Sequence, residues 1–113
     1  MKRAYAETRL GQIHYYEHGR GEPVLMLHET PRSAKSFEPL MQRLGSRYRC
    51  VAPDNPGFGM SDPIPADATM ESLADTMVEV MDALGIERAH LVGFHTGNKV
   101  AAALSARHPH RVG

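Results

Sequence analysis

The sequence predicts an α/β fold in which a mostly parallel sheet carries helices on both faces. Short apolar runs typical of buried strands, such as Val24-Leu25-Met26-Leu27, are separated by stretches whose apolar residues have helical spacing. Polar loops, some rich in glycine and proline, follow these runs. Strands that alternate with helices favour a parallel sheet, because a crossover helix joins each strand to the next.

The first half of the chain begins with a predicted hairpin. Residues 5–10 and 12–18 read as two strands, and the second mixes polar and aromatic side chains as strands at a sheet edge do, with Gly11 in the turn. Two apolar strands follow, at residues 24–27 and 49–53. Between them, a helix is expected over 36–44, where the apolar residues have helical spacing.

The second half continues the alternation after a loop over 54–68 that is rich in proline and glycine. Thr69 is the expected N-cap of the next helix and Gly85 its stop. A fifth strand over 89–92 and a small-sided helix over 98–108 follow. Because another strand should come next, we expect residues 1–113 to be the N-terminal half of a single domain, truncated after the fifth strand and its helix.

The composition excludes several function classes. The 13 basic residues balance the 13 acidic ones, so no electrostatic attraction to nucleic acid or to an anionic membrane is expected. No apolar run is long enough to span a membrane. The single cysteine, Cys50, lies in an apolar run, which favours a buried thiol and a reducing, cytoplasmic setting. The seven histidines match no zinc spacing, and we expect neither a metal nor an organic cofactor.

The run Gly93-Phe94-His95-Thr96-Gly97 has the glycines of a nucleophile elbow but lacks its serine. The G-x-S-x-G motif needs a strand, a sharp turn and a helix, and that context is present here. The middle residue of the turn takes a strained backbone conformation, and flanking side chains would collide with the neighbouring strand or helix. Histidine tolerates positive φ better than most residues. The turn can therefore form around His95, although serine chemistry cannot take place there.

Two further loops follow predicted parallel strands, over residues 27–31 and 54–62. Together with the elbow they resemble the α/β-hydrolase superfamily, whose first loop usually reads H-G-x-P and whose second reads D-x-P-G-x-G-x-S. The second pattern is matched in full, whereas Glu29 replaces the glycine of the first. The resemblance covers nearly the whole chain. It implies the sheet order 1-2-4-3-5, later strands, and hydrolysis of an ester or similar bond in a small organic molecule.

The resemblance assigns roles residue by residue. Thr30 and Thr96 match the positions whose backbone N–H groups form an oxyanion hole, and a main-chain donor survives a change of side chain. His95 matches the nucleophile position. Its imidazole can act as a nucleophile through a ring nitrogen, act as a general base, or be catalytically silent.

Glu29 bears on these alternatives for His95. In the family's strand order the two loops lie side by side, so Glu29 is expected to approach the His95 ring and to raise its pKa. The other interpretation is that Glu29 points to solvent or caps the following turn. His28 is expected to be a structural hydrogen-bonding residue, and Asp54 and Ser61 are expected to organise their loop.

A non-catalytic ligand-binding or regulatory protein that uses the same cleft is the alternative function. In the family, the catalytic acid and histidine come later in the chain. We therefore expect the 113-residue chain alone to be inactive. We also expect the exposed edge of the fifth strand to promote self-association.

Overall fold

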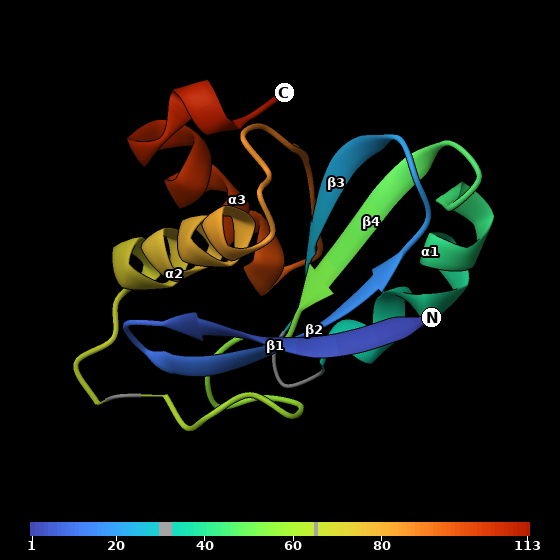
Figure 1. Ribbon diagram of the computed structural model, residues 1–113. Helices are drawn as coiled ribbons and strands as arrows, with labels where there is room; N and C mark the ends of the chain where they lie inside the picture. Colours follow the sequence, from blue (N-terminus) through green and yellow to red (C-terminus); the bar gives the residue numbers. More distant parts are fainter. Residues whose placement is uncertain (30–32, 65) are drawn as a thin grey trace.

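The computed structural model describes residues 1–29, 33–64 and 66–113. One sheet has the strand order β1-β2-β4-β3-β5 (Figure 1). The strands are Lys2–Thr8 (β1), Gly11–His18 (β2), Glu22–Leu27 (β3), Tyr48–Pro53 (β4) and His90–Gly93 (β5). β2 is antiparallel to β1 and β4, and β3 is parallel to β4 and β5. Every strand except β2 therefore runs in one direction, which confirms the mostly parallel sheet and its order.

Helices cover both faces of this sheet, as expected. They are Ala34–Phe37 (η1, a 3-10 helix), Glu38–Leu44 (α1), Met70–Ala83 (α2), Thr96–Arg107 (α3) and Pro109–Arg111 (η2, a 3-10 helix). α2 and α3 pack together on one face, and η1 and α1 lie on the other (Figure 1). Successive residues of β3 supply the two cores: Leu25 joins the cluster under α2 and α3, and Met26 the cluster under η1 and α1.

The start and stop of α2 follow the sequence prediction. Thr69 Oγ1 accepts the Ser72 N–H at 3.1 Å, and Ser72 Oγ accepts the Thr69 N–H at 2.7 Å, so the two residues form a capping box. Gly85, at φ 70°, follows the last turn. Cys50 is a buried free thiol, also as predicted, and burial raises its pKa.

Several element boundaries differ from the prediction by one to three residues, and three of them have a clear local setting. β1 ends at Thr8 rather than at residue 10, because Thr8 Oγ1 accepts the Leu10 N–H at 3.2 Å and begins the turn. The helix expected over 36–44 begins at Ala34 as a 3-10 turn, since Ser33 Oγ accepts the Lys35 N–H at 3.3 Å. α3 begins at Thr96 rather than at residue 98, immediately after the turn residue His95.

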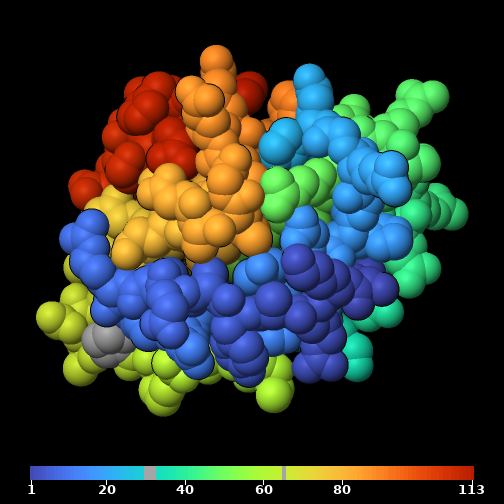
Figure 2. Space-filling model, in the orientation of Figure 1, coloured from blue at the N-terminus to red at the C-terminus, as the bar shows by residue number. Residues whose placement is uncertain are grey.

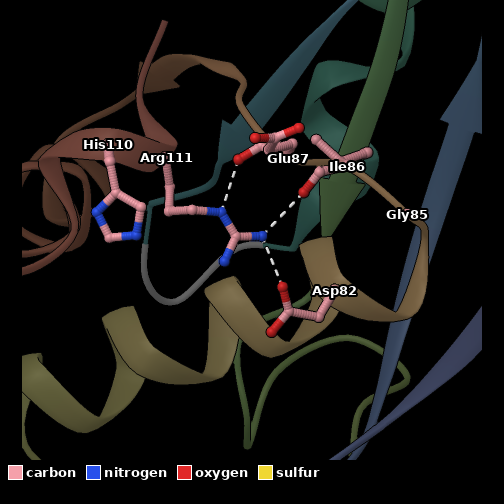
Figure 3. Close-up of a pocket in the computed structure, with 6 residues that line it drawn as sticks. All are labelled: Asp82, Gly85, Ile86, Glu87, His110 and Arg111. Atoms are coloured by element: carbon pink, nitrogen blue, oxygen red, sulfur yellow. Dashed lines mark hydrogen bonds and ion pairs between the residues drawn. The ribbon is translucent and has the colours of Figure 1, made fainter.

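The C-terminal segment is fastened beside the connection between α2 and β5. Arg111 donates to Asp82 Oδ1 at 2.6 Å, to the Ile86 carbonyl at 2.9 Å and to the Glu87 carbonyl at 2.6 Å (Figure 3). Figure 2 shows the two segments, orange and red, side by side on the surface. Val112 then forms a parallel bridge with Ala89, on the side of β5 where the alternating pattern predicts another strand.

Candidate functional site

The three loops singled out in the sequence meet at one edge of the sheet. β4, β3 and β5 are parallel neighbours, so the loops that follow them leave from the same end. The Phe94 N–H donates to the Leu27 carbonyl at 3.2 Å, which joins the β3 and β5 ends. The rings of His28 and Phe58 meet at 6.0 Å, which joins the β3 and β4 loops.

The turn after β5 has the strained geometry that the sequence predicts. His95 has φ 54° and ψ −115°, and it alone has positive φ among the non-glycine residues that the structure describes. The Gly97 N–H donates to the Phe94 carbonyl and the Asn98 N–H to the His95 carbonyl, each at 2.9 Å. The hydrogen bonds of the first turn of α3 therefore hold His95 in a backbone conformation that a side chain disfavours.

Both positions of the turn require glycine, because neighbouring backbone atoms approach them too closely for a side chain. A Cβ on Gly97 would lie 2.0 Å from the Leu27 carbonyl oxygen, so a side chain there would collide with β3. A Cβ on Gly93 would lie 2.7 Å from the Gly97 carbonyl oxygen, within α3. The two collisions are those expected from the motif. They fix the N-terminus of α3 against the end of β3, with His95 at the junction.

The side chain of His95 is exposed at this junction. Its ring meets the Phe94 ring edge-on, with the centroids 4.4 Å apart. Thr96 is half-buried and is the first residue of α3, where the helix dipole places partial positive charge. Thr30, the other predicted oxyanion position, lies outside the described residues.

Glu29 faces a different partner from the one proposed in the sequence analysis. Its Oε1 accepts a hydrogen bond from Ser36 Oγ at 3.4 Å. Within residues 1–29, 33–64 and 66–113, no hydrogen bond or ion pair joins Glu29 to His95. The physical reason is direction: Ser36 belongs to η1, which covers the face of the sheet opposite α3.

His28 is a structural hydrogen-bonding residue, as predicted, and its ring is neutral. Its Nε2 lies 2.8 Å from the backbone N of Asn55, and its Nδ1 lies 2.8 Å from the Glu29 carbonyl oxygen. Because the amide N–H can only donate, Nε2 accepts and Nδ1 carries the proton. Burial lowers the pKa of His28, and the hydrogen bond to the Glu29 carbonyl opposes that shift in part.

Asp54 organises its loop and the one beside it. Its buried carboxylate accepts the Ala34 N–H at 2.7 Å and the Met60 N–H at 3.0 Å, and it lies 2.9 Å from Nδ1 of His14. Ser61 Oγ donates to the Asp54 carbonyl at 2.7 Å. The predicted role of Asp54 and Ser61 is thus confirmed. His14 was missed, because nothing in a strand histidine 40 residues away indicates the contact.

A surface hollow of about 440 Å³ is lined by residues that precede β5 and by the C-terminal segment (Figure 3). His95, which follows β5, does not line it. Arg111 and the connection from α2 line it, and their hydrogen bonds are those that fasten the C-terminal segment. In the described part of the chain, no three His, Cys, Asp or Glu side chains are grouped to hold a metal ion. None of its helices is long and apolar enough to span a membrane.

Comparisons with known proteins give the site a family context. The family described as the alpha/beta hydrolase fold matches residues 22–113. A 2-hydroxy-6-oxo-6-phenylhexa-2,4-dienoate hydrolase of Comamonas testosteroni is 39% identical over 106 residues, which are 89% of this chain and 37% of the relative. Haloalkane dehalogenase 2 of Mycobacterium tuberculosis is 33% identical over 107 residues, 94% of this chain and 37% of the relative. The chain thus spans little more than a third of these relatives.

Solved structures agree with this match. An N-acyl homoserine lactonase mutant, complexed with N-hexanoyl homoserine lactone, is 35% identical with a TM-score of 0.91 and covers 97% of this chain and 42% of its own. An epoxide hydrolase mutant of Vigna radiata is 29% identical with a TM-score of 0.93, covering 98% of this chain and 36% of its own.

Proposed function

The chain belongs to the alpha/beta hydrolase fold family, and from this premise we propose that it is the N-terminal part of a single-domain hydrolase. The bond cleaved is an ester or similar carbonyl bond in a small organic molecule. The observation that carries the proposal is the backbone of His95, held at positive φ between β5 and α3 by two glycines. Relatives that cleave lactones and dienoates support a hydrolytic reaction on small molecules.

In the proposed reaction the turn after β5 is a nucleophile elbow that presents His95 to the scissile carbonyl. The backbone N–H groups of Thr96 and Thr30 form the oxyanion hole. The position of Thr96, directly after His95 and at the positive end of α3, supports the first assignment. The assignment of Thr30 rests on its place in the motif.

Two catalytic roles for His95 lead to different intermediates. As a general base, a ring nitrogen takes a proton from water while the water oxygen attacks the carbonyl carbon, and the imidazolium then returns that proton to the departing alcohol. As a nucleophile, the ring nitrogen itself attacks, the alkoxide departs as the alcohol with the proton of the acylated ring, and water then hydrolyses the acyl-imidazole. Neither route uses a metal or an organic cofactor. The exposure of the ring supports both, because it leaves the imidazole accessible.

Glu29 enters this proposal in a supporting role. Its carboxylate stands at the end of β3, beside the site, but bonds to Ser36. We therefore propose that Glu29 contributes to the shape and the negative charge of the site and does not orient the His95 ring. A catalytic base usually has a partner that orients it, and in this family the acid and the catalytic histidine come from later in the chain. The 113 residues alone should accordingly be inactive.

The alternative is a non-catalytic protein that binds a small ligand in the same cleft. One observation favours it: in the described part of the chain, the ring contact of His95 is with Phe94, and no carboxylate orients the imidazole. A silent histidine needs no orienting partner. For either function we propose a cytoplasmic setting, which the buried free thiol of Cys50 supports, and no nucleic-acid or membrane partner.

The proposed function is tested with a panel of p-nitrophenyl esters and lactones. The assayed protein is the product of the reading frame that contains residues 1–113, and the 113-residue chain is assayed beside it. Turnover with an acyl adduct on His95, found by quenched-flow mass spectrometry, identifies the nucleophile. Turnover without an adduct, slowed in D₂O, identifies the general base. Saturable binding with no turnover of any substrate contradicts the hydrolase and supports the ligand-binding alternative.

A further inference from the structure

The carboxylate of Asp54 gathers hydrogen bonds from three separate parts of the chain. It is 1% exposed, and it accepts from Ala34 before α1, from Met60 in its own loop and from His14 on β2. Hydrogen bonds to a buried ionised group are the strong class of such bonds. This one carboxylate therefore joins the start of η1, the loop after β4 and β2.

His14 is built to hold that carboxylate. The ring is 2% exposed, and the rings of Tyr5 and Tyr16 meet it edge-on at 5.2 Å and 4.9 Å. Arg3 Nε lies 3.3 Å from His14 Nε2. A guanidinium can only donate, so Nε2 accepts and the ring proton stands on Nδ1, which donates to Asp54. Arg3 thus selects the tautomer that Asp54 needs.

The backbone of His14 clamps the same loop at two more points. Its N–H donates to Ser61 Oγ at 2.9 Å, and its carbonyl accepts the Asp54 N–H at 2.8 Å. Ser61 Oγ in turn donates to the Asp54 carbonyl. Residues 54–61 are consequently tied to β2 by one residue, through both its backbone and its side chain.

Asp54 and its neighbour Asn55 together hold the segment that follows β3 at both ends. At the start, the Asn55 N–H donates to His28, whose other ring nitrogen bonds the Glu29 carbonyl. At the far end, Asp54 accepts the Ala34 N–H. Two residues next to one another in the sequence therefore bond His28, directly after β3, and Ala34, the first residue of η1.

We propose that His14 and Asp54 are positioning residues that fix Ala34, the first residue of η1, and Met60, in the loop after β4, relative to β2. They act through the backbone at Ala34 and Met60 rather than on a substrate. Their importance for catalysis rests on the proposed function, because the predicted oxyanion position, Thr30, comes shortly before Ala34 in the sequence. Their effect on the Ala34 and Met60 amides does not, so it can be measured without a substrate.

The test is amide hydrogen exchange by NMR in the 113-residue chain and two variants. His14→Phe keeps a ring of similar size but removes the donor, whereas His14→Asn places an amide N–H where Nδ1 stands. We expect the Ala34 and Met60 amides to exchange about tenfold faster in His14→Phe. Both amides bond to the Asp54 carboxylate, and this carboxylate is held less firmly when the His14 donor is removed. In His14→Asn they should stay close to wild type, and β3 and β4 amides should be unchanged in both variants.

Two results would overturn the positioning role. One is unchanged exchange at Ala34 and Met60 in His14→Phe. The other is an equal acceleration of all amides, which marks a general loss of stability. Should His14→Phe fail to fold, the wild-type chain still decides: long-range ¹⁵N correlation spectra must show the proton of His14 on Nδ1, and a proton on Nε2 would refute the proposal. An inactive enzyme changes none of these readouts, so this proposal and the proposed function fail separately.

Discussion

His95 keeps a backbone conformation that its side chain makes unfavourable. A residue with a Cβ at φ 54° and ψ −115° is strained, and glycine would relieve the strain. Strain of this kind persists where the surrounding structure enforces it, and it clusters at functional sites. Here the enforcement comes from Gly93 and Gly97, which allow α3 to start directly against β3.

This strain should be measurable as stability. We predict that His95→Gly is more stable than His95→Ala by about 1 kcal/mol, because only glycine removes the Cβ that positive φ disfavours. Urea unfolding of the two variants gives the difference directly. Equal stabilities would mean that residue 95 is not held at positive φ in solution.

His28 should make the protein sensitive to mild acid. Its pKa is lowered from 6.5 by burial, so the unfolded chain takes up this proton more readily than the folded one. Stability should therefore fall as the pH drops below 6.5. His28→Gln keeps an acceptor for the Asn55 N–H without a titrating ring. Below pH 6.5 the stability of this variant should therefore depend less on pH than that of wild type. The exposed His110→Gln serves as the control. The prediction fails if His28→Gln and wild type lose stability in parallel.

At the residue scale, the sequence predicts those features that a local motif determines. The roles of Gly93 and Gly97 follow from the strand–turn–helix context. The expected contact between Glu29 and His95 does not form in the described part of the chain, because adjacent loops do not specify which face of the sheet a side chain takes. The contact of His14 with Asp54 depends on the pairing of β2 with β4, and a strand pattern alone does not reveal that pairing.

Between the helices α2 and α3, Asp75 forms the main polar contact. Its carboxylate accepts two hydrogen bonds from Arg107, at 3.0 and 2.7 Å, and lies 2.7 Å from Nε2 of His108. These hydrogen bonds, that of Arg107 foremost, lower the pKa of Asp75 to about 2. The contact joins the middle of one helix to the end of the other, so it complements the apolar packing between them.

Asp75→Asn should destabilise the chain only where the carboxylate is charged. The folded protein binds the Asp75 proton less readily than the unfolded chain, so its contribution is present above pH 3.8 and is lost as the pH falls towards 2. At neutral pH we expect a loss of about 1 kcal/mol, as for a solvent-screened pair. Urea unfolding across this pH range, with Asp67→Asn as an exposed control, measures it. A difference that does not shrink in acid would contradict the assignment.

At the element scale, the periodic segments were predictable and the irregular ones were not. Thr69 and Gly85 mark the ends of α2 in the sequence, and both occur as expected. The 3-10 turn at Ala34 has no apolar period, so the helix was placed two residues late. The 3-10 helix over 109–111 is held by Arg111 contacts with the α2–β5 connection, which only the tertiary structure shows.

For the molecule as a whole, the strand order came from the family resemblance and not from periodicity. Apolar runs show that strands exist, but they do not show that β3 lies between β4 and β5. The order matters, because it places β5 at the end of the sheet. The N–H and C=O groups of Ala89 bond to Arg111 and Gly113, on the side of β5 away from β3. Because alternate residues of a parallel strand bond to the same side, the N–H and C=O groups of Leu91 also point away from β3.

This outward edge should make the 113-residue chain self-associate. Sedimentation velocity should show species larger than a monomer as the protein concentration rises, and the melting temperature should depend on concentration. Leu91→Pro removes one outward N–H without touching a bond to β3, and it should reduce the association. A monomer with a sharp, reversible and concentration-independent melt would contradict the prediction.

The measurement that tests the account most directly is kcat/KM for hydrolysis of the best ester or lactone in the panel, by wild type and His95→Ala. The assayed protein is the product of the full reading frame, with His110→Ala as the control histidine. We predict a loss of about 100-fold or more for His95→Ala, typical of a missing base or nucleophile. We predict no change for His110→Ala. Wild-type hydrolysis by His95→Ala would contradict the claim that His95 performs the chemistry.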